Sequence, residues 1–277
     1  MHVHFLLCFG AVAGDGNPAL VIQGDDAEPA ARQAFSRARK TTCVFIDESE
    51  DGADGGVPRV DFFYPHMRSP LCLHATLGAA AVLFARAPHA GTLAVRTAIN
   101  GQHLELSRDG ADYFVRIAAQ PAPQVDIGDT ALAALLEAPG FVPRTRPRVA
   151  SVGSPKLLVE VADSEAMYAL RPDLAAIAAW SQAHGVNGLY VWCHRPDGAF
   201  EGRNFNHLDP ALEDSATGVA AGALALALGH ESSSGAAIDL DLRQGRMSGR
   251  DCLIRVRRTL DDVQGGALRV GGAATFA

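Results

Sequence analysis

The chain has 277 residues, of which 48% are hydrophobic, and it carries a formal net charge of -7. This length suits two domains or lobes, each with enough chain for a hydrophobic core of its own. The negative charge and the lack of Lys/Arg blocks give no electrostatic reason to expect a nucleic-acid partner. No apolar run reaches the ~18 residues that a membrane-spanning helix needs.

The cysteines and the N-terminus indicate a protein of a reducing compartment. Five scattered cysteines, an odd number with no CxxC pair, argue against a disulfide framework or a structural zinc site. The first residues, MHVHFLLCFG, resemble the apolar core of a signal peptide but lack the Lys or Arg of its leader. A turn and a second apolar run follow, so we interpret this segment as the first strand of a hairpin. We predict a cytoplasmic protein with no membrane partner.

The predicted elements of the first half are strands, separated by short polar or Gly-rich turns, and two helices. The strands are expected near His4–Phe9, Ala19–Ile22, Thr42–Asp47, Arg59–Tyr64, Thr92–Thr97, Leu104–Ser107 and Asp112–Ile117. A surface helix is expected over Glu28–Lys40. A buried helix is expected over about Leu73–Arg86, because this segment is rich in Ala and Leu.

The second half follows a Pro-rich connection, APGFVPRTRPRV, and repeats the character of the first. Two segments, KLLVEV and NGLYVWCH, have the composition of strands, with a helix predicted over about Pro172–His184 between them. A strongly apolar helix is then predicted at SATGVAAGALALALGH, and the chain is expected to end in strands.

The two apolar helices predict an internal duplication. Aligning HATLGAAAVL with SATGVAAGAL places His74 on Ser215 and Thr76 on Thr217. We therefore predict two similar lobes with a cleft between them. The first lobe covers residues 1–130, with its central helix at about 73–86. The second covers residues 131–277, with its central helix at about 215–230, and the chain end could return to the first lobe. The free N–H groups at each helix start could bind an anion.

Several segments, in this order along the chain, resemble one known family. They are GNPALVI, FFYP followed by CLHATLGAA, GSPKLLVEV, LRPDLAAIAAWSQAHGVNGLYVW and RNFNHLDPALEDSATGVAAGALA. Together they resemble the PhzF-like isomerase family of phenazine biosynthesis, from the first strand through QGRMSGR near the C-terminus. The resemblance implies an α+β protein with the diaminopimelate-epimerase fold. Its two similar lobes each have a rolled β-sheet around a central apolar helix, with the active site between the lobes.

The resemblance also implies a chemistry, namely proton transfer on a small unsaturated carboxylic or amino acid by a homodimer that uses no cofactor and no metal. A carboxylate base takes a proton from one carbon, and a proton is returned elsewhere. The helpers of this base correspond here to Asn17, His74 and Asp214, while the two helix starts hold the carboxylate of the substrate. The residues at those starts are Ala75, Thr76, Ser215, Thr217 and Gly218.

Four residues depart from the pattern of the family. Lys40 stands where the family has its catalytic glutamate, and Arg68 stands at an acidic position, where it could supply positive charge to a substrate. Leu73 replaces a glycine and Ser215 replaces a proline. A lysine is protonated at neutral pH unless burial or a nearby cation lowers its pKa, so Lys40 cannot simply inherit the role of a carboxylate.

Each candidate catalytic residue also has an ordinary structural interpretation. Cys72 is either a small core side chain or a reactive thiol, since it aligns with a catalytic thiol of the more distant diaminopimelate epimerases. Lys40 is either a solvated lysine at a helix end or, if it is buried, a base or an imine-forming nucleophile. His74 and Asp214 could cap helices, take part in proton transfer, or do both.

We predict an isomerase that moves a proton on a small-molecule carboxylate, with Lys40, Cys72, His74 and Asp214 as its catalytic residues. Two alternatives stay open. The first is a homologue that binds a small acid in the same cleft without transforming it. The second is a lyase or racemase-type enzyme that uses Cys72 or Lys40.

Overall fold

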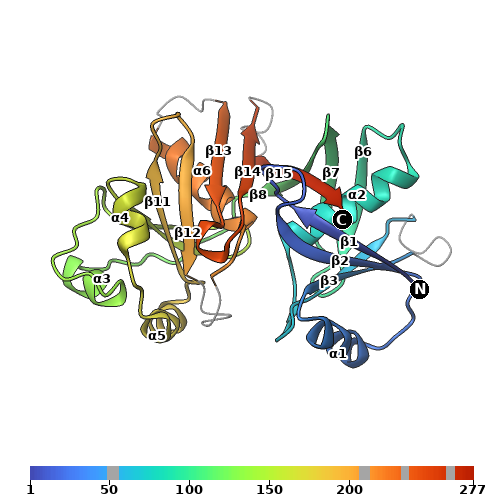
Figure 1. Cartoon of the computed structure of the whole chain (residues 1–277), viewed down its shortest axis with the longest axis horizontal. Helices are drawn as coiled ribbons and strands as arrows, with labels where there is room; N and C mark the ends of the chain where they lie inside the picture. Colours follow the sequence, from blue (N-terminus) through green and yellow to red (C-terminus); the bar gives the residue numbers. More distant parts are fainter. Residues whose placement is uncertain (49–55, 206–212, 232–236, 260–265) are drawn as a thin grey trace. The chain divides into compact units, whose positions relative to one another are not determined.

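Figure 1 shows the computed structural model of the chain, which describes residues 1–48, 56–205, 213–231, 237–259 and 266–277. The chain forms two compact units, Met1–Ile117 with Arg269–Ala277, and Ala118–Leu268. The sequence predicts the boundary at residue 130, but the segment after Ile117 is bonded into the second unit. The amide of Gln120 donates to the carbonyl of Ser151, and the Ile127 side chain lies in the core of that unit.

The first unit is a sheet that closes on itself. Its strands are β1 (His2–Cys8), β2 (Asn17–Gln23), β3 (Thr42–Asp47), β4 (Arg59–Phe63), β5 (Arg68–Ser69), β6 (Thr92–Thr97), β7 (His103–Asp109), β8 (Asp112–Ala118) and the returning β15 (Ala267–Phe276). The pairs β2–β3 and β4–β6 are parallel, and the other pairs along the chain are antiparallel. Strand β15 is next to β8 and also pairs with β1, with Leu7 opposite Thr275, which closes the barrel.

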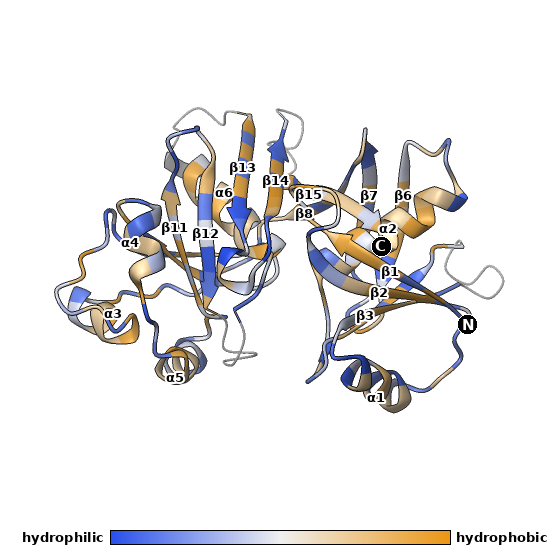
Figure 2. Cartoon of the chain, in the orientation of Figure 1, coloured by the Kyte–Doolittle hydropathy of each residue, from blue (hydrophilic) through white to orange (hydrophobic). Residues whose placement is uncertain are grey.

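Helix α2 (Leu73–Arg86) is the core of the first unit. All of its residues from Leu73 to Phe84 are buried, and it packs against β1, β2, β3, β4 and β6. Figure 2 shows hydrophobic residues over much of its length, as expected for a helix surrounded by protein. Gly78 lets the helix approach β2 closely, because a Cβ atom there would lie 3.2 Å from Cγ2 of Val21. The position of the first turn of α2 is therefore fixed by packing on several strands.

The second unit contains a sheet and five helices among its described residues. The strands are β9 (Arg148–Ala150), β10 (Lys156–Glu160), β11 (Leu189–His194), β12 (Phe200–Phe205), β13 (Ile238–Gln244) and β14 (Cys252–Arg258). The helices are α3 (Asp129–Leu135), α4 (Ser164–Ala169), α5 (Leu174–His184) and α6 (Gly218–Glu231), with a 3-10 helix at Arg246–Ser248. The pairs β10–β11 and β12–β13 are parallel, and the others are antiparallel.

The order of strand pairing is the same in both units. In each, an antiparallel pair is followed by a parallel, an antiparallel, a parallel and an antiparallel pair. Parallel neighbours need a crossover connection, and the chain supplies a helix each time. Helix α1 (Pro29–Arg39) and helices α4 and α5 occupy the first crossover, while α2 and α6 occupy the second. This repeated topology is the internal duplication that the two apolar helices indicate.

The two faces of the sheet in the second unit differ in chemistry. Because side chains alternate along a strand, one face of β10 and β11 carries Leu157, Val159, Leu189 and Val191. These residues form a hydrophobic core with α3, α4 and α5. The other face carries Lys156 and Tyr190 as well as apolar residues, and α6 packs against β9, β10, β13 and β14. The polar side chains of this unit's candidate site lie on that second face.

The predicted elements agree with the structure except in three places. Helix α6 starts at Gly218 instead of residue 215, which leaves Asp214 and Ser215 in the segment before the helix. The surface helix α1 ends at Arg39, so Lys40 is its C-cap instead of its last residue. The short helices α3 and α4 and the strands β5, β9 and β12 are absent from the sequence prediction. None of the described helices is long and apolar enough to span a bilayer.

Candidate functional site

Cys72 and His74 form a buried pair at the start of α2. Cys72 is the N-cap residue of the helix, with φ of -145° and ψ of 103°. Its Sγ atom lies 3.3 Å from Nδ1 and 3.9 Å from Nε2 of His74, and the two residues are only 2% and 6% exposed. The Cys72 carbonyl accepts hydrogen bonds from the amide and the hydroxyl of Thr76, which fixes the turn. A thiol and an imidazole at this separation can exchange a proton.

Two aromatic rings, those of Tyr64 and His66, lie on one side of this pair. The ring centroids of Tyr64 and His74 are 6.3 Å apart, and the ring of Tyr64 stacks on that of His66 at 5.7 Å. Tyr64 directly follows β4, and its amide donates to the carbonyl of Met67. The segment YPHM therefore forms a tight turn that holds Tyr64 against His74. The sequence analysis did not single out Tyr64 or His66, although Tyr64 lies in FFYP, one of the segments that carry the family resemblance.

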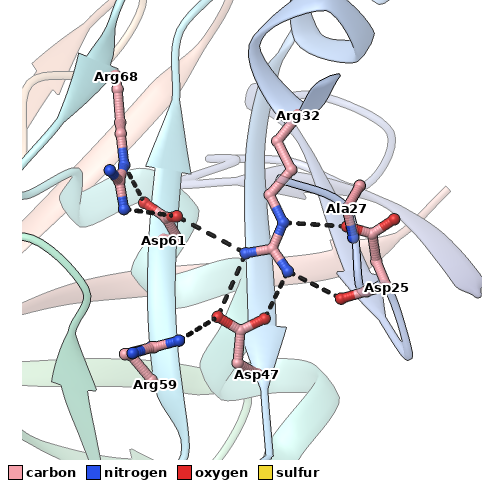
Figure 3. A network of polar contacts seen from close by, with 7 residues as sticks. All are labelled: Asp25, Ala27, Arg32, Asp47, Arg59, Asp61 and Arg68. Carbon is pink, nitrogen blue, oxygen red and sulfur yellow. Dashed lines mark hydrogen bonds and ion pairs between the residues drawn. The ribbon is translucent and has the colours of Figure 1, made fainter. Parts of the chain in front are cut away.

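Arg68 belongs to a network of charged residues on the first unit, drawn in Figure 3. Its Nε and Nη2 atoms donate to the two carboxylate oxygens of Asp61 at 2.8 and 2.9 Å, and Asp61 is 3% exposed. Arg32 lies 3.6 Å from the same aspartate and donates to Asp47 and Asp25. These residues line a cavity of about 810 Å³. The charge of Arg68, which the sequence analysis assigned to a substrate, is balanced here by a buried carboxylate.

Lys40 is an exposed residue. It is the C-cap of α1 in the left-handed conformation, with φ of 50° and ψ of 33°, and its amide donates to the carbonyl of Arg37. Its side chain forms no hydrogen bond or ion pair with the described part of the chain, and so none with Cys72. This position agrees with the interpretation of a solvated lysine at a helix end.

Asn17 begins β2 and is 8% exposed. It lies opposite Cys8 in the β1–β2 hairpin. The preceding Gly16 has φ of 134°, and a Cβ atom there would come within 2.8 Å of the carbonyl oxygen of Cys8, so only glycine fits. The amide of Gly16 donates to the carboxylate of Asp15. The turn GDGN thus places Asn17 in a fixed position.

In the second unit, Asp214 lies within a hydrogen-bond network before α6. Its carboxylate accepts a hydrogen bond of 2.6 Å from the hydroxyl of Thr217. The side-chain amide of Gln244 donates to the carbonyl of Asp214 at 2.7 Å and to the Thr217 hydroxyl at 3.0 Å. Tyr190 in turn donates to the side-chain oxygen of Gln244 at 3.0 Å. Burial, together with Asp214, raises the pKa of Tyr190 well above its usual value, so Tyr190 is a neutral donor.

The neighbours of Asp214 in this segment have other roles in the structure. Glu213 accepts two hydrogen bonds of 2.9 Å from Arg203, whose side chain is buried. Ser215 accepts a hydrogen bond from Ser248 at 2.9 Å. Gly218 is the first residue of α6. Of the two adjacent acids, Glu213 is held by an arginine, and Asp214 is the one whose carboxylate contacts the start of the helix.

Lys156 is the functional candidate that the sequence analysis missed. It begins β10, is 1% exposed, and donates from Nζ to the carbonyl of Asn187. Burial lowers the pKa of Lys156 from 10.5 to about 7, while the negative charge of Asp214 acts in the opposite direction. A signal was present in the sequence: the chain has only two lysines, and this one precedes an apolar strand.

Asn204 on β12 is a second residue that the sequence analysis missed. Its side chain is fully buried, and neither its amide nitrogen nor its amide oxygen has a hydrogen-bond partner among the described residues. It lies opposite Tyr190 in the β11–β12 pair. Buried polar atoms are normally paired, so this amide marks a place where a polar ligand group or a water molecule can bind.

The described residues contain no cluster of three or more His, Cys, Asp or Glu side chains that could hold a metal ion. Both units contain side chains that can act as acids or bases. The first unit presents a thiol beside an imidazole, and the second contains the Asp214 carboxylate and the buried amine of Lys156.

A family model described as phenazine biosynthesis-like protein matches residues 7–277 of this chain. The chain belongs to this family. An uncharacterized isomerase YddE from Salmonella typhimurium is 29% identical over 282 residues, covering 96% of this chain and 94% of that protein. A trans-2,3-dihydro-3-hydroxyanthranilate isomerase from Pseudomonas fluorescens is 28% identical over 262 residues, covering 92% of this chain and 89% of that protein.

The fold is also found among solved structures. A phenazine biosynthesis protein of the PhzF family from Bacillus anthracis matches with a TM-score of 0.82 and 18% identity, covering 100% of this chain and 98% of its own. At this identity the similarity shows the fold alone. The predicted family is confirmed, and so is the prediction that the chain is an enzyme of an isomerase family.

Proposed function

We propose that this protein is a cofactor-independent isomerase that moves a proton on a small carboxylic or amino acid. The observation that carries the proposal is the buried Cys72–His74 pair, with 3.3 Å between Sγ and Nδ1, at the start of α2. His74 takes the proton of the thiol, and the resulting thiolate removes a proton from carbon. The proton returns to another carbon of the same substrate, so the reaction is redox-neutral and consumes no co-reactant.

The replacement of the family's glutamate by Lys40 supports this choice of base. Lys40 is exposed, and its side chain has no hydrogen-bond or ion-pair partner among the described residues that would hold its amine in one position. Cys72 is buried beside a proton acceptor. We therefore assign proton abstraction to Cys72 instead of Lys40.

The remaining predicted residues are proposed to bind the substrate. In each unit, an amide in the first turn of the buried helix is proposed to bind a carboxylate, that of Ala75 in α2 and that of Gly218 in α6. The amides of Thr76 and Thr217 instead donate to the carbonyl of Cys72 and to the side chain of Gln244. Asp214 is proposed to act as a second proton-transfer group, held in place by Thr217 and Gln244. The side-chain amide of Asn204, which has no hydrogen-bond partner in the described part of the chain, supports the presence of a polar ligand group in this unit.

Exchange of substrate hydrogen with solvent deuterium tests the proposal. The protein is incubated in D₂O with trans-2,3-dihydro-3-hydroxyanthranilate and with a panel of small unsaturated carboxylic and amino acids, and exchange is followed by NMR. Cys72→Ala should abolish exchange while the affinity for the ligand, measured by calorimetry, stays nearly the same. Cys43→Ala is the matched control, because Cys43 is a fully buried cysteine of the same unit whose pKa is raised to about 11 by burial.

Two further outcomes of this experiment would support a different base or a protein that only binds its ligand. Loss of exchange in Lys40→Ala, with full activity in Cys72→Ala, would identify Lys40 as the base and overturn our choice. Ligand binding without any exchange in the unmodified protein would favour a non-catalytic homologue that binds small acids. The homodimer implied by the family resemblance is likewise proposed, and light scattering of the purified protein measures it.

A further inference from the structure

Gln244 is the last residue of β13, and its side chain lies against the start of α6. It is 3% exposed, and both ends of its side-chain amide are hydrogen-bonded. The oxygen Oε1 accepts from the Tyr190 hydroxyl at 3.0 Å and from the backbone amide of Thr217 at 3.3 Å. The nitrogen Nε2 donates to the carbonyl of Asp214 at 2.7 Å and to the Thr217 hydroxyl at 3.0 Å. Gln244 therefore joins β11 and β13 to the segment before α6.

Two backbone groups determine the orientation of this amide. A backbone N–H can only donate a hydrogen bond, and a backbone carbonyl can only accept one. The N–H of Thr217 therefore requires Oε1 on its side, and the carbonyl of Asp214 requires Nε2. Reversing the amide would place Nε2 against a donor and Oε1 against an acceptor, and leaving these groups unpaired costs stability. The side chain of Gln244 is thus held in one of its two orientations.

The orientation of Gln244 also sets the direction of the hydrogen bond at Thr217. The Thr217 hydroxyl accepts from Nε2, and its single hydrogen is then available for another partner. That partner is the Asp214 carboxylate, whose Oδ2 atom lies 2.6 Å from the hydroxyl oxygen. The adjacent Glu213 carboxylate instead accepts from Arg203. At the end of this chain of hydrogen bonds, the Asp214 carboxylate is an acceptor.

The bond from Tyr190 to Gln244 depends on a glycine between them. The two side chains come from β11 and β13, which are separated by β12. The phenol of Tyr190 crosses β12 over Gly202, where a Cβ atom would lie 2.2 Å from the hydroxyl oxygen. A larger residue at this position would displace the phenol from Gln244. The chain of hydrogen bonds therefore relies on the packing of the sheet as well as on its polar groups.

The backbone after Gln244 approaches the same segment closely. Gly245 has φ of 110°, and a Cβ atom there would lie 2.8 Å from the carbonyl oxygen of Ser215, so only glycine fits. Further along, Ser248 donates to the Ser215 hydroxyl at 2.9 Å. The segment QGRMSGR, which carries part of the family resemblance, thus contacts residues 214–217 through its backbone and through side chains.

We propose that Gln244 is a positioning residue of the second unit, which acts through the Thr217 hydroxyl to hold the Asp214 carboxylate in one orientation as a hydrogen-bond acceptor. The inference rests on the proposed function, because it takes Asp214 as a proton-transfer group. Such a group must lie within hydrogen-bond reach of the atom that it serves. A displacement of about 1 Å can lower a rate by about 100-fold, so a residue that fixes the carboxylate contributes to the rate.

NMR of the whole protein tests the orientation of Gln244 without using activity. The protein is prepared with ¹⁵N-labelled threonine, and the Thr217 amide is identified by the signal that Thr217→Ser removes. Gln244→Met removes the acceptor of this amide, so its exchange with D₂O should become about tenfold faster or more. Gln182→Met is the matched control, because Gln182 is exposed in the same unit, and it should leave the exchange unchanged.

A second label reports the other end of the amide. With ¹⁵N at Nε2 of glutamine, Gln244 gives two proton signals, which Gln244→Met identifies by their loss. Thr217→Val keeps the shape of the side chain but removes the hydroxyl that accepts one of these protons. One signal should therefore move upfield, while the other, whose proton is donated to the Asp214 carbonyl, should stay. Unchanged exchange of the Thr217 amide in Gln244→Met, or two unchanged Gln244 signals in Thr217→Val, would overturn the proposal.

Activity gives the second arm, with trans-2,3-dihydro-3-hydroxyanthranilate in D₂O as the probe. Gln244→Met and Thr217→Val should each lower the exchange rate at saturating probe by about 10- to 100-fold, with a smaller effect on the affinity for the probe. The double variant should be no slower than the slower single variant, because both changes break the same chain. Thr217→Ser keeps the hydroxyl and should retain most of the rate.

Two results in this arm would contradict the positioning role. One is a rate in Gln244→Met that equals the rate of the unmodified protein. The other is a double variant whose loss is the product of the two single losses, since the two residues would then act independently. If Gln244→Met does not fold, Thr217→Val and Thr217→Ser test the same chain, and equal rates in these two variants would overturn it. If the unmodified protein exchanges no hydrogen of any acid in the panel, the proposed function fails, but the NMR arm still decides whether Gln244 orients the Thr217 hydroxyl.

Discussion

Replacing Lys156 by methionine should make the protein more stable at neutral pH. Methionine has a similar length and no charge, so it fills the same space without requiring an ammonium to leave water. In the folded protein the pKa of Lys156 is about 7, compared with 10.5 when the side chain is in water. The unfolded chain therefore binds more protons than the folded one between these two values, and stability rises with pH in this window.

The size of the effect follows from the two pKa values. The lower pKa in the folded state reduces the free energy of unfolding by about 4 kcal/mol at pH 7 and by about 2 kcal/mol at pH 9. Above pH 10.5 the reduction is small. The stability of Lys156→Met should therefore exceed that of the unmodified protein by a margin that shrinks as the pH rises. Below pH 6, where Lys156 is protonated in both states, the margin should be constant.

Urea unfolding at several pH values measures this margin. Both tryptophans, Trp180 and Trp192, lie in the second unit, so their fluorescence reports the unit that contains Lys156. Lys40→Met is the matched control and should show no pH-dependent difference, because Lys40 is exposed. A margin for Lys156→Met that is the same at pH 7 and pH 9 would refute the reasoning, since it would mean that Lys156 does not titrate in this range.

Three further substitutions test the packing of α2 and the candidate residues of each unit. Cys72→Ser keeps a hydroxyl beside His74 but raises the cost of ionisation, so solvent-deuterium exchange should fall at least 100-fold, measured by NMR. Asn204→Leu removes two buried atoms that have no hydrogen-bond partner among the described residues, so urea unfolding should show unchanged or higher stability, while calorimetry should show weaker binding of the ligand. Gly78→Val brings a side chain against Val21 and should cost about 1–3 kcal/mol of stability by thermal unfolding.

Local sequence patterns are sufficient to predict the framework of the protein. The helix expected over about Leu73–Arg86 is observed with these same bounds, because a dense run of Ala and Leu is compatible only with a helix that is buried on all sides. The repeated apolar helices also indicate the duplication that the strand pairing displays. The predicted boundary at the end of the first lobe is less accurate. No local sequence pattern indicates that the segment after Ile117 forms hydrogen bonds with the second unit, such as the one from Gln120 to Ser151.

Pairings between distant residues could not be predicted in the same way. The sequence placed a free cation at Arg68, but Asp61, seven residues earlier and on a neighbouring strand, neutralises it. The family resemblance also drew attention to Lys40, since it implies that this residue stands at the position of a catalytic glutamate. Whether a lysine is buried depends on which elements pack over it, and this is a property of the tertiary structure.

The family resemblance places Lys40 at the position of the catalytic glutamate. This changes which residues of the protein are candidates for proton transfer. A lysine in place of a buried carboxylate would reverse the charge of the site, and the sequence suggests that Arg68 adds to this reversal. In the structure, Lys40 is solvated and Arg68 is neutralised by Asp61, so neither cation acts on the start of α2 through a bond. Groups that can transfer a proton are the buried Cys72 thiol with His74 and, in the second unit, the half-buried Asp214 carboxylate. The lysine that the resemblance places at the position of the glutamate is therefore compatible with proton transfer, provided that the Cys72 thiol carries the proton.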